Sequence, residues 1–178
     1  MQISHLDDET LYSAKRVNIR GKSLQTPVKS VNFRNLRKDI KIGHREFMGE
    51  IYKTFDKDKI RGLIEDVELQ VNFNRNLNSS IRIGEHFEIE NTLFIPALAY
   101  LNPDENELRF IIATQKQYSE FYVVPTVERL SKHMKKGHSI GDYHALVKEY
   151  LALLEGYPEK PVMGMIPLSI SYQYIIGD

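Results

Sequence analysis

The segment from residue 29 to residue 45 carries the side chains best suited to bind an anion. Its basic residues are Lys29, Arg34, Arg37, Lys38, Lys41 and Arg45, and a single acidic residue, Asp39, opposes them. Basic residues at this spacing can follow the phosphates of RNA or DNA, and the neighbouring asparagines can add neutral hydrogen bonds. The alternative is a solvated loop whose charge is balanced by the acidic stretches 7–9 and 65–68. We expect the basic residues between 34 and 45 to be exposed and to form one positive patch.

Three histidines, His133, His138 and His144, form a second group of residues that can do chemistry. Asp142 and Glu149 lie near them in the sequence, and imidazole with carboxylate ligands can hold a divalent metal. However, the spacing matches no compact metal-binding motif, and a glycine turn separates His133 from His138. This favours solvated histidines near helix ends. We therefore predict no metal site and no cofactor.

Hydroxyl residues that follow apolar runs form a third group, represented by Thr126, Ser139 and Ser169. The backbone N–H groups of a helix N-terminus can bind an anion, but capping of the helix is the favoured role of such hydroxyls. The sequence contains no phosphate-binding loop, dinucleotide fingerprint or nucleophile elbow. It therefore identifies no catalytic residue.

The elements that must position these groups are indicated by three apolar runs, each of which ends in proline. The runs cover residues 92–96, 121–125 and 162–167. Proline cannot donate to a sheet ladder, so it suits the end of a strand, where a loop begins. We predict an α/β fold in which the three runs are neighbouring strands of a mixed sheet with βα units, with their prolines at one side, in a partial or degenerate barrel. The alternative is an α+β fold with an antiparallel sheet.

Helices are predicted over residues 126–136, with Thr126 as the cap and Gly137 as the stop, and over residues 139–155. Both should pack on the sheet, through Leu130, Leu146, Tyr150 and Leu154. The remaining patterns predict strands over 16–19, 28–33, 67–73, 81–89 and 108–113, a helix over 45–55, a short helix capped by Asp56, and a loop over 72–80. The apolar run 162–176 predicts a central strand or one that pairs with another chain.

Composition bounds the class of protein. The chain has 178 residues, which suits a single domain over 1–178, and its 24 basic residues balance its 24 acidic residues. It contains no cysteine, so disulfides, thiolate catalysis and cysteine-ligated metal centres are excluded. The N-terminus lacks the pattern of a signal peptide, and no apolar stretch is long enough to span a membrane. We expect a cytoplasmic protein with no membrane partner.

Residues 20–28, Arg-Gly-Lys-Ser-Leu-Gln-Thr-Pro-Val, resemble the opening of the tRNA-guanine transglycosylase superfamily. In that family a small hairpin leads into a Thr-Pro-apolar strand of a (β/α)₈ barrel. Residues 126–167 are similar to an early βαβ unit of its archaeal-type and DNA-modifying members. The resemblance covers less than half of the chain. It implies a nucleic-acid-related protein that exchanges guanine for a 7-deazaguanine through a covalent Asp–ribose intermediate.

Two features of that family have no counterpart in this chain. The sequence contains neither the catalytic Asp-Ser-Gly motif nor the cysteines of the family's zinc site. A complete barrel also needs about 200 residues or more, so the resemblance implies a partial or degenerate barrel, or the N-terminal part of a longer enzyme. Only the handling of phosphate, and no catalytic residue, carries over to this chain.

Two hypotheses of different classes follow. The first is a nucleic-acid protein of the base-exchange type, whole or fragmentary, which binds RNA or DNA through Arg34, Arg37, Lys38, Lys41 and Arg45. The second is a non-catalytic α+β interaction protein that forms a homo-oligomer through its apolar C-terminal strands. Salt-dependent binding of nucleic acid favours the first, and a stable dimer without such binding favours the second.

Overall fold

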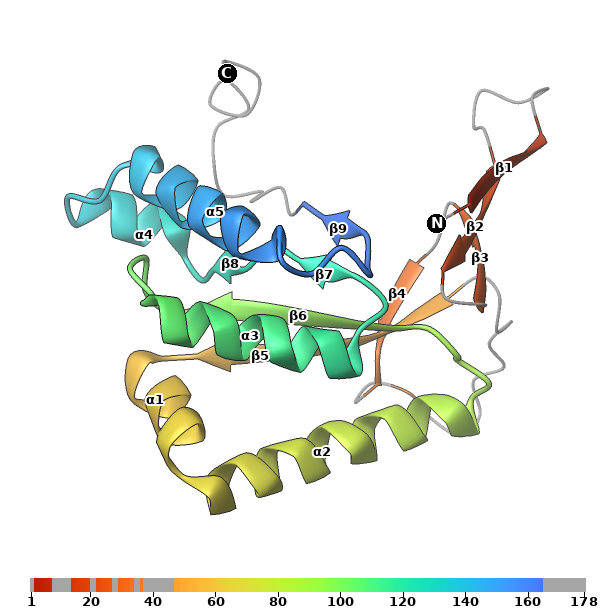
Figure 1. The fold of residues 1–178 in the computed structure, drawn as a ribbon, viewed down its shortest axis with the longest axis horizontal. Helices are drawn as coiled ribbons and strands as arrows, with labels where there is room; N and C mark the ends of the chain where they lie inside the picture. The colour runs from red at the N-terminus through yellow and green to blue at the C-terminus, as the bar shows by residue number, and fades with distance from the viewer. Residues whose placement is uncertain are drawn as a thin grey trace.

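A computed structural model of the chain describes residues 2–7, 14–19, 22–26, 29–33, 36 and 47–164 (Figure 1). The strands are β1 (Gln2–Asp7), β2 (Ala14–Ile19), β3 (Lys22–Thr26), β4 (Lys29–Asn32), β5 (Phe47–Phe55), β6 (Thr92–Leu98), β7 (Tyr122–Val123), β8 (Thr126–Val127) and β9 (Val162–Met163). The helices are α1 (Lys57–Glu65), α2 (Val67–His86), α3 (Glu105–Tyr118), α4 (Leu130–Lys135) and α5 (Ile140–Leu154). None of the helices in these ranges is both long and apolar enough to cross a membrane.

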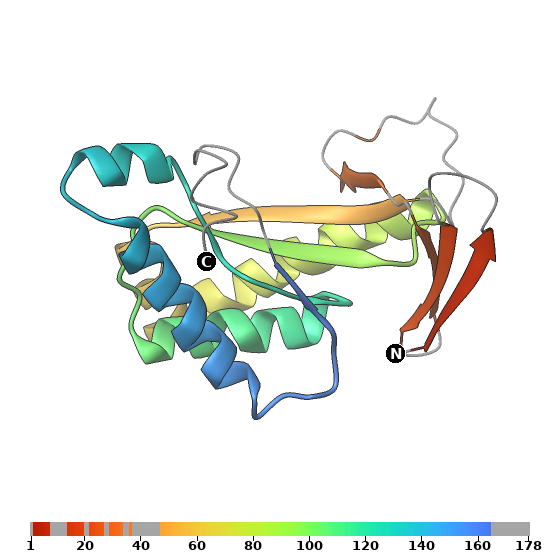
Figure 2. The ribbon, with the colours of Figure 1, turned by 90° about the horizontal axis from the view of Figure 1, so that it is seen from above.

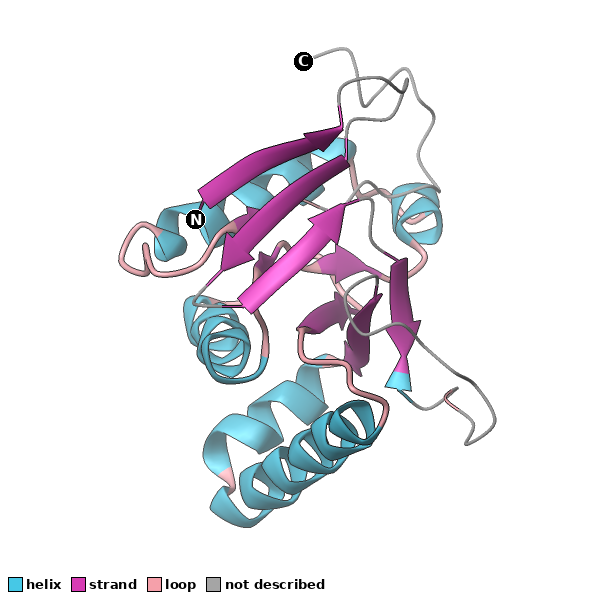
Figure 3. Ribbon diagram, turned by 90° about the vertical axis from the view of Figure 1, so that its right-hand side faces the viewer, coloured by secondary structure: helices cyan, strands magenta, loops and turns pink. Residues whose placement is uncertain are grey.

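The central sheet has four parallel strands in the order β4-β5-β6-β8, and β7 pairs with β9, also in parallel. The helices α1 and α2 lie between β5 and β6, and α3 lies between β6 and β8, so the predicted α/β class with βα units is confirmed. The described strands leave the sheet open and form no closed barrel. The antiparallel alternative is wrong for this sheet. It holds only for the separate sheet β1-β2-β3, which lies in front of the parallel strands in Figure 3.

Two of the three proline-terminated runs lie side by side as predicted. The strand β7 of the run 121–125 pairs in parallel with β9 of the run 162–167. The strand β8, which directly follows the second run, pairs in parallel with β6, and its Thr126 hydroxyl donates to the Pro96 carbonyl at 3.4 Å. Pro96 lies inside β6 and not at its end, which corrects the predicted boundary. The Pro96 carbonyl accepts from Thr126 and therefore points toward β8. In an extended strand the N–H of a residue points to the same side as its carbonyl, so the N–H that proline lacks would also face β8. The proline therefore removes no hydrogen bond to β5. Pro167, the end of the third run, lies outside the described residues.

The main core lies between the parallel sheet and the helices α1, α2, α3 and α5. Phe55 and Phe94 point from neighbouring strands into this core and are fully buried, with Phe73 and Phe110 against them. The predicted packing of the last two helices is confirmed, because all four predicted contact residues are buried there: Leu130, Leu146, Tyr150 and Leu154. Burial of each such side chain contributes about 1.5–3 kcal/mol to stability.

The opposite face of the same strands carries a smaller apolar cluster near their amino ends. Its buried residues are Leu24, Met48, Leu93, Ile95 and Val123. Because side chains alternate along a strand, residues 50, 52 and 54 of β5 share this face with Met48. This face is therefore apolar at the amino end of the sheet and polar at its carboxyl end.

The ring of Phe33, the residue that directly follows β4, packs closely against two glycines, Gly49 of β5 and Gly84 of α2; their positions are called the Phe33 slot. The ring is buried, and a Cβ atom added at Gly49 of β5 would lie 1.7 Å from it. A Cβ atom at Gly84 of α2 would lie 2.4 Å from the same ring. Both glycines are therefore required by close packing and not by backbone conformation.

The predicted helix over 45–55 is wrong, because this segment contains β5. Ile51 and Phe55 face the main core, while Met48 faces the smaller cluster. A strand that is buried on both faces loses the alternation of a half-buried strand. Its apolar residues then fall by chance at helical spacing.

The predicted strands over 67–73 and 81–89 and the loop over 72–80 are also wrong, because 67–86 is the single helix α2. The alternating Val67, Leu69 and Val71 are exposed, whereas Phe73 and Leu77 are buried at helical spacing. Asp66 caps this helix. The predicted strand over 108–113 is wrong for a similar reason, since it belongs to α3, which begins with a capping box.

Several smaller predictions are confirmed. Asp56 caps α1, and Ser139 caps α5 in a capping box with Asp142. The predicted strands over 16–19 and 28–33 contain parts of β2 and β4. Thr126 is not a helix cap, because it belongs to β8, and α4 begins only at Leu130. Residues 165–178, and with them most of the apolar C-terminal run, lie outside the described residues.

Candidate functional site: two cavities at opposite ends of the sheet

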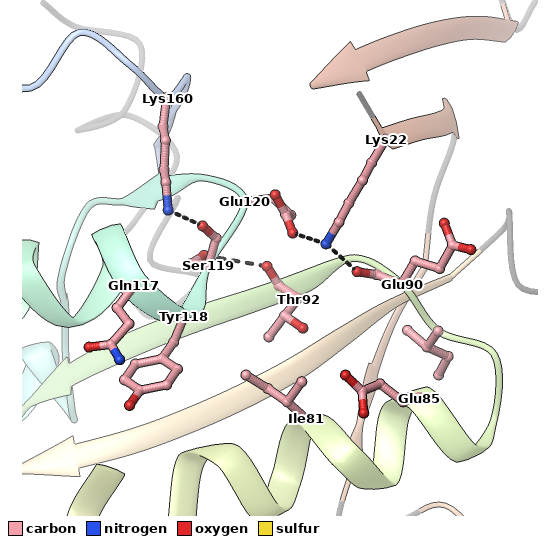
Figure 4. Close-up of a pocket in the computed structure, with 11 residues that line it drawn as sticks. Lys22, Ile81, Glu85, Glu90, Thr92, Gln117, Tyr118, Ser119, Glu120 and Lys160 are labelled. Carbon is pink, nitrogen blue, oxygen red and sulfur yellow. Dashed lines mark hydrogen bonds and ion pairs between the residues drawn. The ribbon is translucent and has the colours of Figure 1, made fainter. Parts of the chain in front are cut away.

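The parallel sheet has a cavity at each end. The amino-end cavity, of about 380 Å³, lies where β6 begins and where α3 leads into β7 (Figure 4). Lys22, Glu90, Thr92, Ser119, Glu120 and Lys160 line it, together with side chains from α2 and α3. Its two lysines, Lys22 and Lys160, could bind an anionic ligand only if the protein leaves them without partners.

Lys160 is held by the protein itself. Its side chain is buried, and its Nζ atom donates to the carbonyls of Gln115, Lys116 and Ser119 at the C-terminal end of α3. The last carbonyls of a helix have no partner within the helix and carry its negative dipole end. Lys160 therefore acts as a buried cap of α3.

Lys22 connects the β1-β2-β3 sheet to the rest of the molecule. Its Nζ atom pairs with the Glu120 carboxylate at 2.5 Å and donates to the Glu90 carbonyl at 2.7 Å (Figure 4). Glu120 is mostly buried, so its charge needs this partner. Both lysines of the amino-end cavity thus hold structure together.

A buried polar network behind this cavity joins β6 to β7. The Gln115 amide donates to the carbonyls of Phe94 and Val123, and its own oxygen accepts from Tyr150. The Phe94 N–H donates to the Ser119 hydroxyl at 3.1 Å. Side chains therefore replace backbone ladder bonds between the two strands, and burial raises the pKa of Tyr150 so that it remains a donor.

The carboxyl-end cavity, of about 330 Å³, differs in its charge. Its lining residues are Ala99, Glu128, Arg129, Lys132, His133 and Lys136. It lies just beyond the ends of β6 and β8, toward which the arrowheads of β5 and β6 point in Figure 1. Ligands of open α/β sheets bind in the crevice outside the carboxyl ends of parallel strands. Its position and its basic lining make it the candidate functional site.

The helix α4 presents the basic side chains of this cavity as one row. Lys132 and His133 lie on α4, Arg129 and Lys136 are the residues at its two ends, and all four line the cavity. Leu130, on another face, is fully buried in the main core and anchors the segment. Figure 2 shows α4 on the opposite side of β5 and β6 from α3 and α5.

The turn into α4 is strained. Arg129 has φ 53° and ψ 41°, the left-handed conformation, and no side chain caps the helix that it begins. This conformation costs a non-glycine residue about 1 kcal/mol or more, and such residues concentrate at functional sites. Here the turn places the Arg129 side chain at the cavity.

One carboxylate lies among these basic side chains. The Oε1 atom of Glu128 accepts a 2.6 Å hydrogen bond from the Thr54 hydroxyl and a 3.5 Å contact from the Tyr52 hydroxyl. Burial, followed by the neighbouring Glu128 carboxylate, raises the pKa of Tyr52. Tyr52 is therefore protonated at neutral pH and stays a donor. Two residues of β5 thus fix the position of Glu128.

Among the described residues, no carboxylate forms an ion pair with the basic side chains of the carboxyl-end cavity. Arg109, by contrast, pairs with Glu105, and Lys116 pairs with Glu159. Lys132 and Lys136 are exposed at the cavity. Their charges are available to an anionic ligand.

A buried ionic cluster lies near the start of α3. Glu107 is fully buried, closes the capping box on Asp104 and lies 3.4 Å from Arg61, atom Nε to Oε1. The Tyr100 hydroxyl, also buried, has its pKa raised by burial and then by the Glu107 charge. This cluster secures the loop after β6.

The structure places the predicted site residues as follows. The basic residues Arg34, Arg37, Lys38, Lys41 and Arg45 lie outside the described residues, so their role stays a prediction. The rings of His133 and His138 lie 5.9 Å apart, and His138 lies 3.5 Å from Asp142. No group of three potential metal ligands converges in the described part of the chain.

Four residues of this cavity are not among those predicted from the sequence: Glu128, Arg129, Lys132 and Lys136. Their signal is a row of basic residues at helical spacing directly after an apolar run that ends in proline. With the helix predicted to begin at Thr126, these basic residues belong to an ordinary solvated helix face, which does not indicate a binding site.

Comparisons of the chain with protein-family models, with curated proteins and with solved structures find no match. A function for the carboxyl-end cavity has to come from its own residues.

Proposed function

We propose that this chain binds a phosphate-bearing ligand of the nucleic-acid type at the carboxyl-end cavity. The observation that supports this proposal is the row of basic side chains around the cavity, which have no acidic partner among the described residues. Cations left unpaired beside a concave surface attract phosphate oxygens and release the counterions that these carry.

The local charge is notable because the whole chain has no net charge. A general electrostatic attraction to nucleic acid therefore cannot arise from the overall composition, and binding has to be local. Four basic residues that follow one row suit a chain of successive phosphates better than a single carboxylate.

The proposal agrees with the first hypothesis from the sequence. The resemblance to the tRNA-guanine transglycosylase superfamily implies handling of a nucleic-acid phosphate, and the basic segment 29–45 would add further phosphate contacts. Base exchange itself remains a prediction from that resemblance.

The test measures binding of a fluorescent single-stranded RNA of about 20 nucleotides by anisotropy, between about 50 and 200 mM salt. The double variant Lys132→Ala/Lys136→Ala should bind less tightly, and the magnitude of the slope of log K against log salt should fall by about 1.4, because each phosphate contact on a single strand contributes about 0.7. The matched control is Lys116→Ala/Lys148→Ala, which removes two exposed lysines from the α3 and α5 helices.

The control should keep the slope of the wild-type protein. Equal losses in both double variants would reduce the effect to overall charge and contradict a specific site. Absence of wild-type binding at low salt would overturn the proposal.

The second hypothesis, an interaction protein, is favoured by a different observation. Val162 of β9 is 47 % exposed, and β9 pairs only with β7 among the described strands. An edge of this kind can accept a strand from another chain. Light scattering over a range of concentrations tests it, because a dimer that persists on dilution, without RNA binding, would favour this hypothesis.

A further inference from the structure

We propose that the carboxyl-end cavity recognises the sugar of its ligand, with Glu128 accepting hydrogen bonds from the hydroxyls of a ribose. The ligand class is then RNA or a ribonucleotide, and not DNA. This inference rests on the proposed function, because it deepens the use of the same cavity.

A carboxylate lies within the basic lining of the carboxyl-end cavity. Glu128 is the single acidic residue that lines the carboxyl-end cavity in the described part of the chain. A carboxylate weakens binding of phosphate, since like charges repel at short range. Its presence suits recognition of a neutral part of the ligand that carries hydrogen-bond donors.

Only one of the two carboxylate oxygens of Glu128 contacts a donor among the described residues. Thr54 and Tyr52 both contact Oε1, and the described residues offer no donor to Oε2. An ionised carboxylate is an acceptor with room for several hydrogen bonds. Oε2 is therefore available to a ligand in the cavity.

The Glu128 carboxylate is held in place by β5. The Thr54 hydroxyl lies on the same face of β5 as Tyr52 and donates to Glu128 at 2.6 Å. Both donors come from a rigid strand that pairs along its length with β6. A fixed acceptor loses little freedom when a ligand binds, so it discriminates more strongly between ligands.

The hydroxyls of a ribose match these requirements. They are neutral donors, they lie a few bonds from the phosphates, and acidic side chains recognise them in nucleotide-binding sites. The 2′-hydroxyl is the group by which a protein distinguishes RNA from DNA. A deoxyribose would leave the charged acceptor without this donor, which reduces affinity.

The experiment compares the same RNA with a DNA of equal sequence in which deoxyuridine replaces uridine, so that only the 2′-hydroxyls differ. The wild-type protein should bind the RNA about tenfold more tightly, the effect of one hydrogen bond to a charged group. In Glu128→Gln this ratio should fall toward one, and affinity for the DNA should not decrease, because a repulsive charge is removed.

Two further variants separate position from charge. Thr54→Val removes the donor that positions Glu128 without changing any charge, and it should also lower the ratio. The control Glu50→Gln makes the same charge change on the same face of β5, where Glu50 accepts from Ser30 outside the cavity. It should keep the wild-type ratio.

The outcomes distinguish the two proposals. Equal binding of RNA and DNA that still depends on Lys132 and Lys136 would overturn the recognition of ribose and leave the proposed function standing. An unchanged ratio in both Glu128→Gln and Thr54→Val would also overturn it. No binding of either nucleic acid would overturn the proposed function and, with it, this inference.

Discussion

The two ends of the parallel sheet use lysine in different ways. At the amino end, Lys160 is buried and donates to three backbone carbonyls, and Lys22 pairs with Glu120. At the carboxyl end, Lys132 and Lys136 line a cavity of similar size, where the described residues provide no ion-pair partner. A lysine beside a cavity is therefore a candidate for ligand binding only where no carboxylate or carbonyl of the protein already holds its ammonium group.

The difference follows from what surrounds each cation. The end of α3 offers carbonyls that need donors, so a lysine there satisfies the fold. The helix α4 buries Leu130 and turns its basic row outward. We therefore expect changes at the amino end to alter stability and changes at the carboxyl end to alter binding.

The largest effect on stability is expected for Gln115→Leu, behind the amino-end cavity. This change leaves the carbonyls of Phe94 and Val123 and the Tyr150 hydroxyl without their buried partner. The free energy of unfolding should fall by about 3 kcal/mol or more, at 1–3 kcal/mol for each unsatisfied group. Urea denaturation measures it. The exposed Gln117→Leu on the same helix is the control and should change it by less than about 0.5 kcal/mol.

Lys160→Met should have the next largest effect. Methionine fills a similar volume but leaves the last carbonyls of α3 without the donor that now satisfies them. We expect a loss of about 2 kcal/mol in the free energy of unfolding. If Lys160→Met lowers the free energy of unfolding no more than the exposed Lys148→Met does, Lys160 is not a structural cap. The lysines at the two ends of the sheet would then not differ in their role.

Gly84→Ala tests the close packing around Phe33. Alanine favours a helix by about 1 kcal/mol over glycine, but its Cβ atom would meet the Phe33 ring. We expect net destabilisation of about 1–2 kcal/mol, as for an overpacked core. The double variant Phe33→Leu/Gly84→Ala should cost less than the two single changes added together. Strict additivity in thermal and urea unfolding would mean that the two residues do not share the slot.

The smallest effect on stability is expected for Lys132→Ala/Lys136→Ala. Neither side chain is buried or ion-paired among the described residues, so the free energy of unfolding should change by less than about 0.5 kcal/mol. A loss above about 1 kcal/mol would assign these lysines to the fold. Their effect on RNA binding would then not be separable from structure.

Local signals in the sequence predicted the caps of α1 and α5 and the strand β6. Asp56 and Ser139 are caps whose hydrogen bonds depend on residues nearby in the chain, so their motifs suffice. The apolar run of β6 is buried on both faces and could be recognised from its length and composition. The fold class follows from these elements.

Errors arose where burial depends on distant residues. The alternation of Val67, Leu69 and Val71 is typical of a strand, yet these residues are exposed on a helix. The pattern of β5 is typical of a helix because the strand packs against two clusters at once. Neither partner surface can be read from the segment alone.

The carboxyl-end site escaped prediction for a related reason. Glu128 is an acceptor for Thr54 and Tyr52, which precede it by 74 and 76 residues. Only the parallel pairing of β5, β6 and β8 brings them together. The sequence pattern favours solvated histidines near helix ends for His133 and His138, so it does not single out the basic residues beside them as a site.

The most direct test of the central claim is hydrogen exchange of the full chain with and without saturating RNA. Bound RNA should slow exchange over residues 126–138, which carry the basic row, and leave residues 116–123 at the amino end unchanged. Protection of residues 29–45 in addition would agree with further phosphate contacts there. Protection confined to residues 116–123 or to residues 29–45, with 126–138 unchanged, would contradict binding at the carboxyl-end cavity.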